Sequence, residues 1–163
     1  MERRQIGLRL VLDQLRLPVQ VGSFEDRLIL QKAVYLAQAA GVHLGYYFRW
    51  YLRGPYCPSV AEDGFCVAAE LAQDVDDSKG WSLDAASTER AMGIRGLVTG
   101  GDRTALAKRL ELLASVHFLI DRKQVSGQSP EKIAAVLKKF GKDFDANDVR
   151  LALGELREHA ILA

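Results

Sequence analysis

Apolar residues recur at helical spacing along most of this chain. In residues 3–16, one face of the predicted helix carries four apolar side chains: Leu8, Val11, Leu12 and Leu15. They follow the i, i+3, i+4, i+7 spacing of an amphipathic helix. The same periodicity predicts helices over residues 24–40, 58–73, 103–121 and 145–162, and over a segment that starts at Pro130 and ends before Gly141.

Two of the helical segments differ from this simple pattern. Residues 24–40 are apolar on more than one side, which predicts a central helix with neighbours on two faces. Residues 85–98 are weakly patterned, and we expect them to be only partly helical because Gly93 and Gly96 destabilise a helix.

Between residues 46 and 53 the apolar period changes to two. One side of this segment carries Phe48, Trp50 and Leu52, and the other carries Tyr47, Arg49, Tyr51 and Arg53. The alternation predicts a β-strand whose first set of side chains faces the core. Gly54-Pro55 is predicted to force a turn after it. The expected fold is mainly α, a single helical domain (residues 1–163) with one short β segment near 46–53 and a C-terminal helix-turn-helix-like pair.

Length and composition agree with one globular domain. The chain has 163 residues, of which 48% are hydrophobic and 26% are charged, as is ordinary for globular proteins. The 22 Lys and Arg residues nearly balance the 21 Asp and Glu residues, so no whole-molecule charge attracts nucleic acid or an anionic membrane. No apolar run approaches a signal-peptide core or the roughly eighteen residues of a membrane span. We expect a cytoplasmic protein with no membrane association.

The residue patterns of common catalytic and metal sites are missing from the sequence. Neither a glycine-rich phosphate loop nor a nucleophile elbow occurs. The three histidines are too far apart to form a pair with zinc-ligand spacing. One of them, His117, lies on an apolar stripe, either as a hydrogen-bonded core residue or as a ligand or base. We predict no catalytic residues, no cofactor and no metal, and an enzyme of unrecognised type is the last alternative.

The two cysteines, Cys57 and Cys66, are too few for a disulfide framework and lack C-x-x-C spacing. We expect both thiols to be reduced. Cys57 precedes a predicted helix N-terminus and lies close to Arg53 in sequence, so a reactive thiol and an inert half-buried thiol both stay open at this position.

The last two predicted helices, with a turn around residues 141–144, look like a helix-turn-helix, which raises the question of DNA binding. The second of them carries four carboxylates against two arginines, whereas a helix that reads a DNA groove needs positive charge. The first helix and the turn after it are basic, with Lys132, Lys138, Lys139 and Lys142. A nucleic-acid-binding regulator that uses these lysines is therefore the alternative function.

Two motifs carry a family resemblance. The first is Leu30-Gln31-Lys32-Ala33-Val34-Tyr35, and the second is Trp50-Tyr51-Leu52-Arg53-Gly54-Pro55-Tyr56. With them, residues 24–73 resemble the Panacea-type domains of antitoxins and adaptor proteins, and more closely a group of prokaryotic proteins with the same helix, aromatic strand and Gly-Pro turn. The resemblance implies a mainly helical protein that acts by binding a partner protein, typically a toxin, rather than by catalysis. Self-association into a homo-oligomer is a further alternative.

The resemblance assigns partner binding to six residues: Gln31, Lys32, Arg53, Gly54, Pro55 and Tyr56. The alternation of the strand adds an exposed ridge of Arg49, Tyr51, Arg53 and Tyr56 beside the turn. Arginine and tyrosine are enriched at interface hot spots, which favours a contact with a protein. In the competing interpretation the tyrosines pack under a neighbouring helix, and Arg49 or Arg53 pairs with Glu62 or Asp63.

Overall fold

The computed structural model describes residues 1–163 and contains seven helices and one two-stranded sheet. The elements, in chain order, are α1 (Arg3–Gln14), α2 (Phe24–Ala39), β1 (Arg49–Tyr51), β2 (Gly54–Tyr56), α3 (Pro58–Ala72), α4 (Ala85–Gly93), α5 (Arg103–Asp121), α6 (Pro130–Lys139) and α7 (Ala146–Glu158). The predicted mainly helical fold is confirmed, and every predicted helix is present with ends that differ by a few residues. All seven helices contribute side chains to one continuous apolar core.

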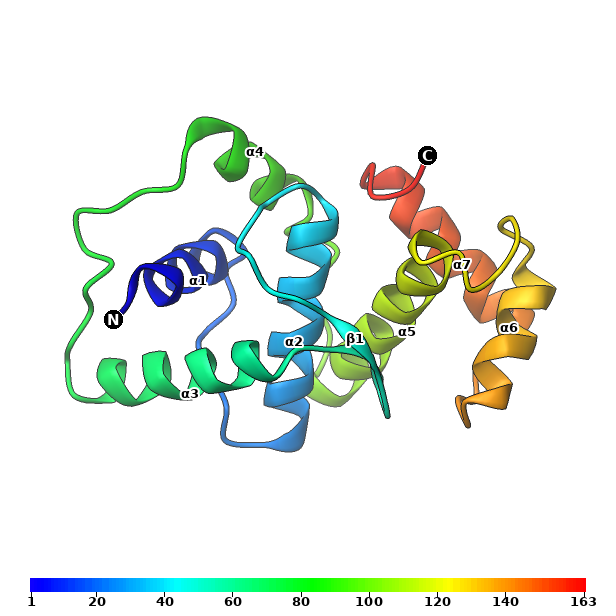
Figure 1. Cartoon of the computed structure of the whole chain (residues 1–163), viewed down its shortest axis with the longest axis horizontal. Coiled ribbons are helices and arrows are strands. Elements are labelled where there is room, and N and C mark those ends of the chain that lie inside the picture. Colours follow the sequence, from blue (N-terminus) through cyan, green and yellow to red (C-terminus); the bar gives the residue numbers. More distant parts are fainter.

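Helix α2 runs through the middle of the molecule (Figure 1). The nine consecutive residues Ile29–Ala37 are all buried, because α5 packs on one side of the helix while α1, α3 and β2 pack on others. The prediction of a central helix with neighbours on two faces is thus confirmed. A polar side chain within this run has no route to water and must find its hydrogen-bond partner inside the protein.

A capping box and an ion pair to α5 fix the start of α2. Ser23 caps the helix: its Oγ accepts from the backbone N–H of Asp26, and the Asp26 carboxylate accepts from the backbone N–H of Ser23. The same carboxylate forms an ion pair with Arg103, whose Nη2 lies 2.5 Å from Oδ1. Arg103 is the first residue of α5, so this pair holds the first turn of α2, including Phe24, at the start of α5.

The β segment is a hairpin rather than one strand of eight residues. Strand β1 pairs antiparallel with β2, so that Arg49 lies opposite Tyr56 and Tyr51 lies opposite Gly54. Leu52 and Arg53 form the turn between the strands. The sequence prediction was therefore wrong on two counts: the strand begins at Arg49, and Gly54-Pro55 does not form the turn but opens the second strand.

The predicted alternation holds for part of the segment. Phe48 is buried and Trp50 is half-buried, as expected for the core side. Leu52 is 75% exposed, because it lies in the turn, where the chain reverses and the period of two is interrupted.

Helices α6 and α7 pack against each other, and α7 packs against α5. They lie on the far side of α5 from α1, α3 and α4 (Figure 1). Ser129 caps α6 and Asp145 caps α7, each through its side chain. None of the helices has the length and apolar character needed to cross a bilayer.

Candidate functional site

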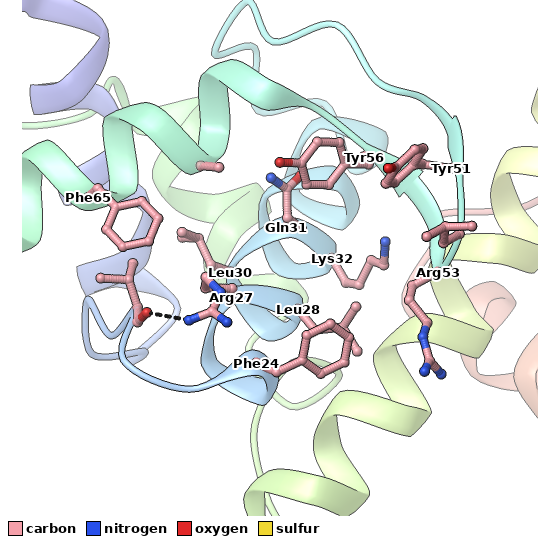
Figure 2. Close-up of a pocket in the computed structure, with 13 residues that line it drawn as sticks. Phe24, Arg27, Leu28, Leu30, Gln31, Lys32, Tyr51, Arg53, Tyr56 and Phe65 are labelled. Atoms are coloured by element: carbon pink, nitrogen blue, oxygen red, sulfur yellow. Dashed lines mark hydrogen bonds between the residues drawn. The ribbon is translucent and has the colours of Figure 1, made fainter.

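A groove opens between α2, the hairpin and α3, and we call it the hairpin groove (Figure 2). It encloses about 530 Å³, and nine of its 13 lining residues are hydrophobic. Its large apolar side chains are Phe24, Leu28, Leu30, Tyr51, Leu52, Tyr56 and Phe65. A mostly apolar hollow with a few polar groups is the usual form of a binding site.

Several of these apolar side chains are exposed to solvent. Phe24 is 51% exposed, Tyr51 59% and Phe65 49%. The rings of Tyr51 and Tyr56 lie 5.5 Å apart, centroid to centroid. The guanidinium of Arg53 lies over the Phe24 ring at 5.5 Å, within the range of a cation–π contact. The hairpin and the first turn of α2 thus meet around one apolar opening.

The predicted ridge is only partly one surface. Tyr51, Arg53 and Tyr56 line the hairpin groove. Arg49 is exposed but lies outside the groove lining. The competing ion pairs are not present: neither Arg49 nor Arg53 pairs with Glu62 or Asp63, and Asp63 is bound by Arg4 and Tyr46. The nearest carboxylate to Arg53 belongs instead to Glu111, with Nη1 at 3.9 Å from Oε2.

Gly54 and Pro55 lie beneath this surface. Both are buried, and Gly54 adopts φ +90°. A Cβ at Gly54 would stand 2.4 Å from Oγ of Ser115 on α5. These two residues therefore hold the hairpin close to the helices, rather than offering side chains to a partner, and this corrects their assignment as contact residues.

Gln31 and Lys32 are buried, and both also line the hairpin groove. The Gln31 amide exchanges two hydrogen bonds with the backbone of Cys57: Nε2 donates to the carbonyl at 2.8 Å, and Oε1 accepts from the N–H at 3.0 Å. Lys32 donates from Nζ to the Pro55 carbonyl at 2.6 Å. Lys32 thus fixes β2 onto α2, and Gln31 fixes the residue that follows β2 at the start of α3.

Burial changes the chemistry of Lys32, whose residue is only 1% exposed. Desolvation lowers the pKa of its amine from 10.5 to about 7. The positive charge of Lys142 acts in the same direction, and the negative charge of Glu111 opposes it. The amine that anchors Pro55 is therefore close to half-charged at neutral pH.

This shift predicts a pH-dependent stability. Between about pH 7 and pH 10 the unfolded chain keeps a proton on Lys32 that the folded protein has lost, so the free energy of unfolding rises with pH by up to about 1.4 kcal/mol per pH unit. Below about pH 7 both states carry the proton, and the effect of Lys32 no longer changes with pH. We expect urea unfolding from pH 6 to 9 to show this rise for the wild type relative to Lys32→Met.

The matched control is Lys138→Met, because Lys138 is exposed. Its free energy of unfolding should run parallel to that of the wild type over the same pH range. Parallel curves for Lys32→Met and the wild type would show that Lys32 keeps its ordinary pKa in the folded protein.

Of the four lysines proposed to bind nucleic acid, three are exposed and one is buried. Lys132, Lys138 and Lys139 are exposed on α6. Lys142 is buried and donates from Nζ to Oε1 of Glu111 at 2.7 Å and to the Leu52 carbonyl at 3.1 Å. It neutralises a buried carboxylate and holds the hairpin turn, so its assignment as a phosphate contact is corrected.

The remaining candidates for site chemistry are His117 and the two cysteines. His117 is buried, its Nδ1 lies 2.7 Å from the Tyr35 hydroxyl, and desolvation lowers its pKa. The interpretation as a hydrogen-bonded core histidine is confirmed. Cys57 is buried, Cys66 is exposed, and neither forms a disulfide. No three side chains of His, Cys, Asp or Glu come together in a way that could hold a metal ion.

The sequence interpretation missed Phe24, Leu28 and Phe65 as lining residues of the groove. A signal was available for the first two, because Phe24 and Leu28 are four residues apart and fall on one helix face. Phe65 on α3 carried no comparable signal, since its position depends on how α3 packs against α2.

Comparisons of the chain with protein-family models, with curated proteins and with solved structures give no match. The function is therefore inferred from the groove and from the two motifs that line and anchor it.

Proposed function

We propose that this protein is a non-catalytic interaction domain that binds a partner protein in the hairpin groove. The observation that supports the proposal is the groove itself, an apolar hollow bordered by the exposed rings of Phe24, Tyr51 and Phe65. Clustered exposed apolar side chains mark interaction sites more often than scattered ones do. The proposal agrees with the partner-binding role implied by the Panacea-type resemblance, in which the partner is typically a toxin.

The composition of the groove favours a protein partner. Tyr51, Tyr56 and Arg53 are of the residue types that supply most binding energy at protein interfaces, since each buries a large area and keeps a polar group for recognition. The groove is also held in shape before binding, because Lys32 ties β2 to α2 and Gln31 ties the start of α3 to α2. A preformed site loses less conformational entropy when the partner binds.

Site-specific photo-crosslinking in cells that produce the protein natively tests this proposal. A photoreactive amino acid at Tyr51, inside the groove, is expected to capture one specific protein. The same group at Tyr47, which is 87% exposed and outside the groove, is expected not to capture it.

The captured protein is then purified, and its affinity is measured by calorimetry. Tyr51→Ala and Phe65→Ala are expected to weaken binding by roughly tenfold or more, as hot-spot residues do. Tyr47→Ala is the matched control and should change the affinity by no more than about twofold. Equal capture from both positions, or wild-type affinity in the two groove variants, would contradict binding in the hairpin groove.

A further inference from the structure

The charged groups of the hairpin groove all have one sign. Its lining contains three basic side chains, Arg27, Arg53 and the partly charged Lys32, and no carboxylate. An apolar site with only positive charges favours a ligand that combines apolar groups with a negative charge.

Two of these cations already have partners within the chain. Arg27 donates to the carbonyls of Val21 and Gly22 at 3.0 and 3.4 Å, and Figure 2 shows the first of these bonds. Lys32 donates to the Pro55 carbonyl. Neither side chain is positioned primarily to meet a partner.

Arg53 is different. Its guanidinium makes no hydrogen bond within the chain, and its contacts are the Phe24 ring and the distant carboxylate of Glu111. Lys142 holds Glu111 through Oε1 at 2.7 Å, and Oε2 of Glu111 lies 3.9 Å from Nη1 of Arg53, too far for a hydrogen bond. The N–H donors of Arg53 therefore have no hydrogen-bond acceptor within the chain. A guanidinium presents two parallel N–H groups that match the two oxygens of a carboxylate. The Phe24 ring holds this donor group at the opening of the apolar hollow.

The groove also continues past Arg53. A second hollow of about 750 Å³ lies towards α5 and the segment between α6 and α7. It is more polar than the hairpin groove, and its lining includes the carboxylates of Glu25, Glu111 and Asp143. It shares four lining residues with the hairpin groove: Phe24, Leu28, Leu52 and Arg53. Two hollows with Arg53 at their common edge suit an extended chain segment better than a compact small molecule.

We propose that the groove binds a segment of the partner protein in which an acidic side chain lies next to bulky apolar ones. The apolar side chains occupy the hairpin groove, and the carboxylate pairs with Arg53 at the edge of the groove. This inference rests on the proposed function and specifies the chemistry of the bound segment.

A display selection tests it and does not require that the partner be identified first. Random linear peptides of about twelve residues are selected on the immobilised full-length protein and on two variants, Arg53→Glu and Arg49→Glu. Both arginines are exposed, so both variants are expected to fold, which circular dichroism checks. Arg49 lies outside both hollows and serves as the matched charge-reversal control.

The wild type and Arg49→Glu are expected to enrich peptides with Asp or Glu next to Leu, Ile, Phe or Trp. Arg53→Glu is expected to lose this enrichment. For one selected peptide, replacing its acid by the isosteric amide should weaken binding to the wild type by roughly tenfold, and Arg53→Glu should cause a similar loss. A lysine in place of that acid should restore binding to Arg53→Glu.

Two results would overturn the inference, and they can be told apart. Selected peptides that lose binding in Tyr51→Ala but show no preference for an acid would leave groove binding intact and remove the role of Arg53. Peptides whose binding is unchanged in both Tyr51→Ala and Arg53→Glu would count against the hairpin groove itself and thus against the proposed function.

Discussion

Replacing Lys142 by methionine is expected to lower the free energy of unfolding by about 3 to 5 kcal/mol. The ammonium of Lys142 and the carboxylate of Glu111 are both buried, and Nζ lies 2.7 Å from Oε1. Removing the Lys142 ammonium leaves the Glu111 carboxylate buried in a low-dielectric environment without its partner. The loss of stability is larger than the net contribution of the intact pair. Arg53, at 3.9 Å from Glu111 and mostly exposed, compensates only weakly. Chemical denaturation monitored by circular dichroism measures the loss.

Two variants complete this test. Lys139→Met removes an exposed lysine from the same region and should change stability by no more than about 0.5 kcal/mol. The double variant Lys142→Met with Glu111→Met replaces the pair by apolar side chains of similar size and should recover about half of the loss or more. A Lys142→Met variant as stable as Lys139→Met would show that Lys142 is a surface residue and would reopen its assignment to a phosphate contact.

Helical periodicity predicted the helices because their apolar faces are a local property of the sequence. The continuous apolar character of residues 24–40 also predicted the central place of α2. Two polar residues inside that run, Gln31 and Lys32, were assigned to a partner surface. Their position within nine buried residues was itself a signal of inward-facing side chains, since a polar group in such a run needs an internal partner.

The hairpin could not be predicted from local rules alone. Glycine and proline usually mark turns, and Gly54-Pro55 was interpreted in that way. The turn instead lies two residues earlier, at Leu52 and Arg53. It is held by Lys142, which is 90 residues away in the sequence and donates to the carbonyl of Leu52. Pro55 is accepted in β2 because both strands of a two-stranded sheet are edge strands, where the missing N–H of proline is tolerated. Its carbonyl receives the hydrogen bond from Lys32.

The hairpin groove also could not be predicted from local rules. Its lining comes from α2, the hairpin, α3 and the connector before α2, and their mutual placement depends on how the helices pack. The motif that contains Tyr51, Arg53 and Tyr56 identified one wall of it. That Arg53 has no hydrogen-bond acceptor becomes evident only from the structure, in which Nη1 lies 3.9 Å from Oε2 of Glu111.

Gly54→Ala is expected to lower the free energy of unfolding by about 2 to 5 kcal/mol, from two separate causes. The first is backbone strain, because φ is +90° at Gly54 and residues with a Cβ rarely adopt this conformation. The second is overlap: the new methyl group would stand 2.4 Å from Oγ of Ser115. Ser115 is fully buried on α5, so α5 and the hairpin must separate or Ser115 must leave its rotamer. Thermal and chemical unfolding measure the total loss.

Two further variants separate the strain from the overlap. Gly45→Ala has a similar φ of +82° with nothing within 4 Å of the new Cβ, so it reports strain alone, at about 1 to 2 kcal/mol. Ser115→Ala removes the overlapping oxygen, which has no hydrogen-bond partner, and by itself should be neutral or slightly stabilising. Adding it to Gly54→Ala should recover the overlap part of the loss and leave the strain. Equal losses in Gly54→Ala and Gly45→Ala would mean that β2 does not lie against α5 as closely as the structure places it, and the fixed position of the groove wall would then lose its explanation.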